Sequence, residues 1–160
     1  MEINQLIWAI ILSVLPVSEL RGGIPLAINY ALGNNLPILP IVTLIILLNC
    51  AVVFFIFFFL DRFHQSLMKV KVYNKFYSAY LKRLRKKIDK FETKYASYGF
   101  LALTLFVAIP FPTTGAWSGT LISWILGLER KKSILAIIAG VIIAGIIVSL
   151  ASLGIIKLFF

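Results

Sequence analysis

Two charged side chains, Glu19 and Arg21, interrupt an apolar part of the sequence in the run PVSELRGGIP, residues 16–25. A charged group at membrane depth is energetically costly, and such groups commonly mark a substrate pathway or an ion-coupling site. Burial disfavours the charged form of a carboxylate and a nearby positive charge favours it, so Glu19 suits reversible protonation. The guanidinium of Arg21 keeps its charge and offers a planar fork for phosphate or carboxylate. We interpret this run as a substrate or proton site. The alternative is structural: a Glu19–Arg21 ion pair, or a bond to exposed backbone.

A second run with polar side chains, PFPTTGAWSG at residues 110–119, occurs 94 residues later. Pro16 then aligns with Pro110 and Gly33 with Gly127, and each run precedes a long apolar segment. This agreement in the order and length of the segments indicates an internal repeat. Trp117 can stack on a substrate or wedge the chain, and we favour the wedge. The candidate substrate or proton site comprises Ser18, Glu19, Arg21, Gly22, Gly23, Thr113, Thr114 and Trp117.

The composition is that of an integral membrane protein. Hydrophobic residues make up 61% of the 160 residues and charged residues 14%, against about 25% charged in ordinary soluble domains. The net charge of +10 is concentrated, because 11 of the 16 Lys and Arg residues lie between residues 62 and 94. This pattern favours contact with anionic lipid headgroups over nucleic acid. One histidine, one cysteine and no catalytic or metal-binding motif predict a protein that is not an enzyme and needs no metal or cofactor.

Residues 3–33 predict a hairpin of two short helices, each below the length of about 20 residues that spans a bilayer. The first helix, 3–15, is expected to break at Pro16. Gly22-Gly23 is then the sharp turn, and the second helix, 24–33, has Pro25 in its first turn. Residues 99–128 predict a second such hairpin, with its tip at 110–119 and its return arm at 120–128. The residues expected to shape the hairpins are Pro16, Pro25, Pro110, Pro112, Gly115 and Gly119.

Two segments, 37–60 and 133–154, are apolar and long enough to span a bilayer. Asn49 in the first segment is expected to form a hydrogen bond to another helix. The alternative is that its side chain extends to the hairpin tips. The second span carries mostly small residues four apart, which favours close helix packing, either within the monomer or across a dimer. These are Ala136, Gly140, Ala144, Val148 and Ser152.

The segment 61–98 combines an apolar and aromatic stripe at helical spacing with basic residues on its other faces. It predicts a long amphipathic helix on an anionic membrane surface, and a coiled-coil or helical-hairpin seam is an equal alternative. No Gly or Pro lies between Pro40 and Gly99, so the first span can continue directly into it. The basic residues expected to contact headgroups are Lys82, Arg83, Arg85, Lys86 and Lys87.

The distribution of positive charge separates two topologies. If both hairpins return to the side that they enter from, only the two long segments cross, and both basic segments, 61–98 and 129–132, share one face. The positive-inside rule then puts this face in the cytoplasm and both termini outside the cell membrane. The resulting fold is a single all-α membrane domain, 1–160. It is an inverted repeat of re-entrant hairpin plus transmembrane helix, 3–60 and 99–154, with the basic helix between the halves, as in many secondary transporters.

The runs PVSELRGGIPLA (16–27) and PFPTTGAW (110–117) resemble the putative small multidrug export proteins, and the similarity covers nearly the whole chain. The paired hairpins are more distantly similar to the DedA (VTT-domain) superfamily. That resemblance implies lipid translocation, including recycling of the polyprenyl phosphate carrier, and proton dependence. DedA proteins carry arginines in the second hairpin; this chain has none there, which leaves Arg21 as the buried cation.

We therefore predict a secondary-transporter-like protein that moves an amphipathic, anionic substrate of the lipid-phosphate type, with Glu19 as the proton-responsive group. A proton-coupled multidrug or metabolite exporter is the first alternative. A non-transporting scaffold that binds anionic lipid through its basic helix is the second. Two spans and two hairpins offer little material to enclose a pathway, so a homodimer is expected.

Overall fold

A computed structural model of the chain describes residues 3–67, 96–111 and 114–159, and every secondary-structure element in these ranges is a helix. The all-α prediction is therefore confirmed. The helices are α1 (Ile3–Val14), α2 (Glu19–Gly33), α3 (Ile38–Leu67), α5 (Ala96–Ala108), α6 (Ala116–Ile125) and α7 (Arg130–Phe159).

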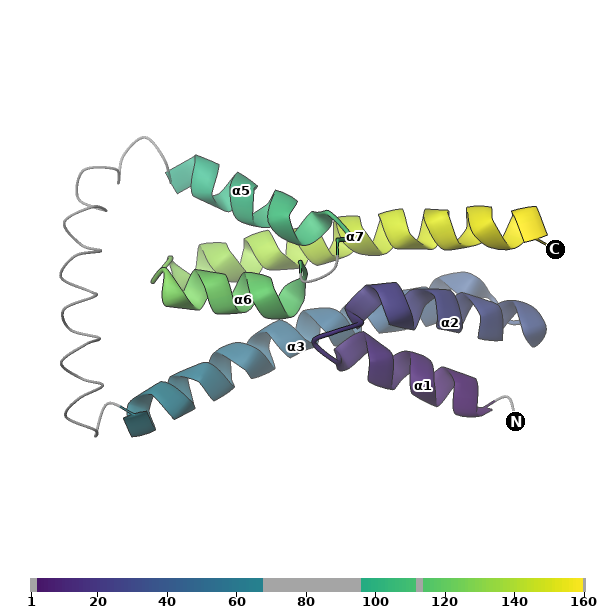
Figure 1. Cartoon of the computed structure of the whole chain (residues 1–160), viewed down its shortest axis with the longest axis horizontal. Coiled ribbons are helices and arrows are strands. Elements are labelled where there is room, and N and C mark those ends of the chain that lie inside the picture. Colours follow the sequence, from purple (N-terminus) through teal and green to yellow (C-terminus); the bar gives the residue numbers. More distant parts are fainter. Residues whose placement is uncertain (1–2, 68–95, 112–113, 160) are drawn as a thin grey trace.

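Helices α3 and α7 run along most of the length of the molecule (Figure 1). Their stretches Ile38–His64 and Arg130–Gly154 are long and apolar enough to cross a membrane, in agreement with the two predicted spans. Because neither Gly nor Pro occurs between Pro40 and Gly99, α3 can continue beyond residue 60, and within the described residues it extends to Leu67. Residues 68–95, with Lys82, Arg83, Arg85, Lys86 and Lys87, lie outside the described part of the chain.

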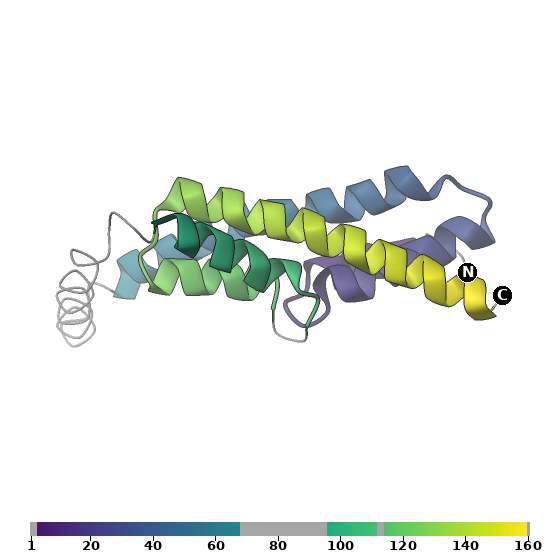
Figure 2. The same ribbon diagram turned by 90° about the horizontal axis from the view of Figure 1, so that it is seen from above.

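The four shorter helices form two antiparallel pairs, α1 with α2 and α5 with α6 (Figure 1). They contain 12, 15, 13 and 10 residues, fewer than the roughly 20 needed to span a bilayer. The α1–α2 pair lies at the end of the molecule where α7 finishes, and the α5–α6 pair lies at the opposite end, as the view from above also shows (Figure 2). The loops that join the helices of each pair therefore meet near the middle.

The first turn lies earlier than the sequence predicts. The chain turns over residues 15–18, and α2 begins at Glu19 rather than at residue 24. Pro25 consequently lies inside α2 rather than in its first turn, and Gly22-Gly23 is helical. These glycines serve close packing instead, since a Cβ at Gly23 would lie 2.8 Å from the carbonyl oxygen of Ala9 in α1.

The second return arm also begins earlier than predicted, because α6 starts at Ala116 and not at residue 120. Gly119 is thus part of a helix rather than of the tip. A Cβ at Gly119 would lie 2.6 Å from Cγ2 of Val107 in α5, so this glycine allows the two helices to approach each other. Gly119 therefore contributes to the packing of the two helices of this pair and not to the loop between them.

The small residues of α7 face the interior of the monomer. Ala136, Ala144, Val148 and Ser152 are at most 8% exposed. A Cβ at Gly140 would lie 2.7 Å from the carbonyl oxygen of Thr104 in α5. Packing within the monomer, one of the two predicted uses of this stripe, is therefore confirmed.

A polar cluster joins α3, α6 and α7 at the end of the molecule away from the N-terminus. Asp61 forms an ion pair with Arg130 and accepts a hydrogen bond from Nε1 of Trp124, 3.0 Å long. The guanidinium of Arg130 lies 4.7 Å from the ring centroid of Phe57, a cation–π contact. The cluster fixes the start of α7 against the end of α3.

Candidate functional site

Glu19 is the first residue of α2 and is buried, at 5% exposure. Its backbone has φ 46°, in the left-handed region that residues other than glycine adopt uncommonly. Such conformations concentrate at functional sites, where the surrounding structure holds them in place. The preceding turn is supported by the hydroxyl of Ser18, which donates a 2.6 Å hydrogen bond to the carbonyl of Leu12.

The carboxylate of Glu19 binds the start of α6, in the other half of the chain. Its Oε2 accepts a hydrogen bond from the N–H of Ala116 at 3.2 Å, and its Oε1 accepts one from the N–H of Trp117 at 3.1 Å. These are the first two N–H groups of α6, which have no carbonyl partner inside their own helix. The helix dipole also favours a negative charge there. Glu19 therefore caps α6 across the two helix pairs.

Gly115 makes this contact possible. It is the N-cap residue of α6 and has extended backbone angles that any residue can adopt. A Cβ at this position, however, would overlap the carboxylate of Glu19. The glycine is therefore required by the close approach of Glu19, a side chain of the protein itself.

Arg21 makes the complementary contact. Its side chain is half-buried, and Nη2 donates a hydrogen bond to the carbonyl of Thr114 in the opposite loop. Glu19 and Arg21 do not form an ion pair in the described part of the chain, where the ion pairs include Asp61–Arg130 and Glu129–Lys132. Of the predicted alternatives, bonds from both side chains to exposed backbone are what the structure contains.

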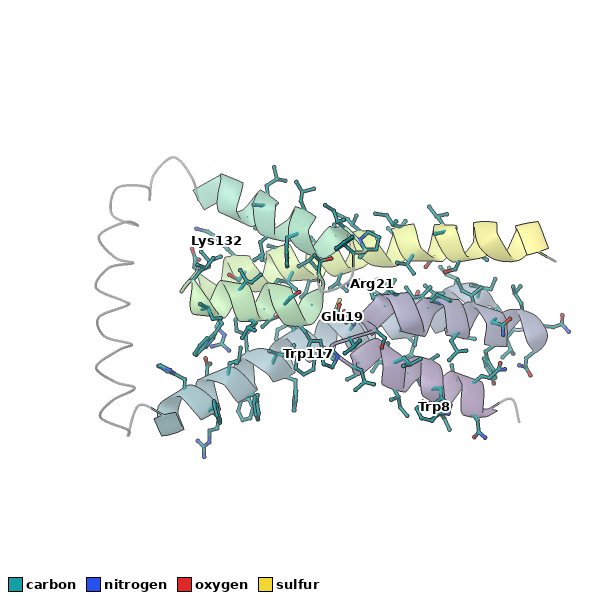
Figure 3. The ribbon with its side chains drawn as sticks, viewed as in Figure 1. Trp8, Glu19, Arg21, Trp117 and Lys132 are labelled. Carbon is teal, nitrogen blue, oxygen red and sulfur yellow. The ribbon has the colours of Figure 1, made fainter. Side chains whose placement is uncertain are left out.

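Trp117 lies next to Glu19, at the contact between the two helix pairs (Figure 3). Its indole Nε1 donates a 2.9 Å hydrogen bond to the carbonyl of Val14, the last residue of α1. Carbonyls at a helix C-terminus lack partners inside their own helix, so the Val14 carbonyl is free to accept this bond. Because Val14 and Trp117 belong to different halves of the chain, the bond joins the two halves. The position of Trp117 agrees with the wedge that we favoured.

The hydroxyl groups of the second loop serve the loop itself. Oγ1 of Thr114 donates to the carbonyl of Ile109 at 2.6 Å and accepts a hydrogen bond from the N–H of Phe111 at 3.2 Å. Ser118 Oγ donates a longer bond to the carbonyl of Gly115, at 3.4 Å. Pro112 and Thr113, which were predicted to belong to the tip, lie outside the described residues.

A cavity of about 10 Å³ lies between the loops and the long helices, room for about one water molecule. Glu19, Arg21 and Thr114 line it together with Asn49 of α3. Asn49 is fully buried, and its Nδ2 donates a 2.6 Å hydrogen bond to the carbonyl of Ser13 in α1. The predicted helix–helix hydrogen bond of Asn49 is therefore confirmed, and its reach to the tips is present as well. Its polarity within an apolar span was the signal for both.

A much larger apolar groove, of about 650 Å³, is lined in part by Trp117. Aromatic and aliphatic side chains of α3 and the first loop form most of its wall, and Ser118 is its main polar group. Among the described residues, no three His, Cys, Asp or Glu side chains gather as a metal site. The residues lining the groove are Pro16, Val17, Phe55, Ile56, Phe59, Leu60, Trp117, Ser118 and Leu121.

The chain was compared with known protein families, curated proteins and solved structures. The family model described as "Putative small multi-drug export protein" matches residues 19–147, most of the chain. The match begins at Glu19, directly after the first loop, and includes the second loop. No curated protein and no solved structure matches the chain. The more distant similarity to the DedA superfamily stays a prediction.

Proposed function

The chain belongs to the putative small multi-drug export protein family, and we propose that it is a small membrane transporter whose working centre is the contact between Glu19 and α6. The family and the two long apolar helices indicate a membrane protein, and the family description is that of a transporter rather than an enzyme. The observation that carries the proposal is the buried carboxylate of Glu19, which holds the start of α6 from the other half of the chain.

We propose that α3 and α7 cross the bilayer while the α1–α2 and α5–α6 pairs are re-entrant hairpins of an inverted repeat. Three observations support this topology. The short helices are below spanning length, the two pairs lie at opposite ends of the molecule, and their loops meet in the middle (Figure 1). The start of α1 and the end of α7 share one end, which the positive-inside rule puts outside the cell, with the basic segment in the cytoplasm.

In the proposed cycle, protonation of Glu19 opens the centre. The charged carboxylate accepts hydrogen bonds from Ala116 and Trp117, and charge-assisted bonds of this kind are about twice as strong as neutral ones. A neutral carboxyl holds these N–H groups less firmly, so the two hairpins can separate. The N-terminus of α6 and the guanidinium of Arg21 then become available to an anionic group of the substrate.

We propose an amphipathic, anionic substrate of the lipid-phosphate type. Arg21 and the N-terminus of α6 suit an anion, and Arg21 would repel a purely cationic substrate. The apolar groove beside Trp117, of about 650 Å³, suits the apolar part of such a molecule. Proton-coupled export of small drug-like molecules is the alternative that the family description favours. The scaffold alternative depends on residues 68–95, outside the described part of the chain.

The test is translocation in proteoliposomes under a proton gradient, with a short-chain fluorescent polyprenyl phosphate and with a cationic dye. Wild type is compared with Glu19→Gln and with Glu129→Gln, a control that removes the same charge from an exposed ion pair. We expect movement of the phosphate lipid by wild type and by Glu129→Gln, with loss in Glu19→Gln. Movement of the dye alone would favour the exporter. Movement of neither would overturn transport and leave the scaffold.

We further propose a homodimer, because two spans and two hairpins give little protein to enclose a pathway. Native mass spectrometry in mild detergent tests this directly. A monomer that retains translocation activity would overturn it.

A further inference from the structure

The side-chain oxygen of Asn49 has no hydrogen-bond donor among the described residues, although Asn49 is fully buried. The orientation of this amide is determined by its other end. Nδ2 lies 2.6 Å from the carbonyl oxygen of Ser13, which can only accept a hydrogen bond, so the nitrogen must be on that side. Oδ1 is consequently an acceptor, and buried acceptors in folded proteins nearly always have a donor.

Oδ1 belongs to a side chain that lines the same cavity as the carboxylate of Glu19. The cavity volume of about 10 Å³ is about that of one water-sized group, and therefore of one carboxyl oxygen. Of the residues that line it, only Glu19 and Arg21 are charged; those from α3, α5, α6 and α7 are uncharged, and α1 carries no charged residue. A charged carboxylate gains nothing from Oδ1, because both groups are acceptors.

A protonated Glu19 changes this relationship. Its new O–H group needs an acceptor, whereas the groups that hold it now, the N–H groups of Ala116 and Trp117, are donors. The guanidinium of Arg21 is also a donor. Asn49 Oδ1 is the side-chain acceptor of the cavity that is free of another donor in the described structure.

We propose that Asn49 is the partner of protonated Glu19: on binding a proton, the carboxyl turns from the start of α6 into the cavity and donates its hydrogen to Asn49 Oδ1. This inference rests on the proposed proton-responsive role of Glu19 and adds where the proton is held. Asn49 is a positioning residue, which stabilises the protonated form and so sets the pH at which the hairpins separate.

The test is infrared difference spectroscopy of the full chain in lipid nanodiscs, titrated with acid. A carboxylic acid C=O band that is present in wild type and absent in Glu19→Gln reports the protonated Glu19. In Asn49→Leu we expect this band at higher frequency, because the O–H has lost its acceptor. The midpoint of the titration should also fall by roughly 0.5–1 pH unit, the equivalent of one neutral hydrogen bond. Thr104→Val is the matched control. It also removes a buried polar group, but that hydroxyl bonds to Phe100 of its own helix and lies outside the cavity.

The outcomes separate the inference from the proposed function. A Glu19 band with unchanged frequency and midpoint in Asn49→Leu would overturn the role of Asn49 and leave the proton site intact. If wild type and Glu19→Gln show the same carboxylic acid bands throughout the titration, Glu19 does not bind a proton and its proposed proton-responsive role is overturned. If Asn49→Leu does not fold, the side-chain carbonyl of Asn49 in wild type gives the answer by ¹³C solid-state NMR. Its chemical shift should move with the Glu19 midpoint, and a constant shift would overturn the inference.

Discussion

The carboxylate of Glu19 occupies the space that a side chain at Gly115 would need. Glu19 belongs to the α1–α2 pair and Gly115 to the α5–α6 pair, and Gly115 immediately precedes the N–H groups that Glu19 binds. The central contact between the halves therefore depends on a residue without a side chain on one side and a carboxylate on the other. This pairing makes a prediction that a double mutant can test.

Gly115→Ala is expected to destabilise the protein by about 1–3 kcal/mol, the usual cost of inserting a methyl group into a filled space. The backbone of Gly115 is extended, so the loss must come from the displaced carboxylate rather than from backbone strain. Denaturant unfolding of the detergent-solubilised protein measures the change.

The matched control repeats the same substitution in a Glu19→Ala background, which lacks the carboxylate that the new Cβ would overlap. There Gly115→Ala should cost less than about 0.5 kcal/mol, so the cycle isolates the coupling between the two positions. An equal cost in both backgrounds would contradict the contact between Glu19 and Gly115.

Gly23→Ala should be among the most destabilising glycine substitutions in the first helix pair. Its Cβ would lie 2.8 Å from the carbonyl oxygen of Ala9 and 2.7 Å from Cβ of Ser13, so α1 itself would have to move. We expect a loss of about 1–3 kcal/mol. Gly33→Ala, in the same helix with no atom within 4 Å of the added Cβ, should be neutral or stabilising by up to about 1 kcal/mol. Thermal unfolding of the two variants side by side checks this, and equal midpoints would contradict the close packing of α1 on α2.

Arg21→Gln is expected to reduce translocation of an anionic lipid phosphate roughly ten- to hundredfold at substrate concentrations below saturation, the equivalent of one charged hydrogen bond. Arg21→Lys keeps the charge but loses the planar fork, so its activity should lie between wild type and Arg21→Gln. The proteoliposome assay with the fluorescent phosphate lipid measures both. Unchanged transport in Arg21→Gln would show that Arg21 has only a structural role, through its hydrogen bond to the carbonyl of Thr114.

The sequence predicts the long helices better than it predicts the local turns. Runs of apolar residues report membrane-length helices directly, and Glu19 is conspicuous in an apolar stretch. The Gly22-Gly23 pair misled because glycine signals a sharp turn and close helix packing equally well, and only the neighbouring helix α1 decides between them. The hydrogen-bond partners of Glu19 could not be predicted from the sequence for a different reason. They are backbone N–H groups 97 and 98 residues away, which no side-chain pattern marks.

Substitutions of Asp61 test whether the polar cluster of Asp61, Trp124 and Arg130 holds α3, α6 and α7 together. Its ion pair with Arg130 is substantially exposed, at 39% and 48% of the side chains, so Asp61→Asn should cost about 1 kcal/mol or less. An asparagine oxygen can still accept the hydrogen bond from Trp124, which is partly buried. Asp61→Leu leaves this indole N–H without its acceptor and should cost about 1–3 kcal/mol. Added salt should reduce the stability difference between wild type and Asp61→Asn and leave the difference between Asp61→Asn and Asp61→Leu unchanged, because only wild type has the Asp61–Arg130 ion pair to screen. Thermal unfolding of the three proteins at low and high salt measures these effects. Equal stability of Asp61→Asn and Asp61→Leu would show that the indole bond contributes nothing and that charge alone acts at this position.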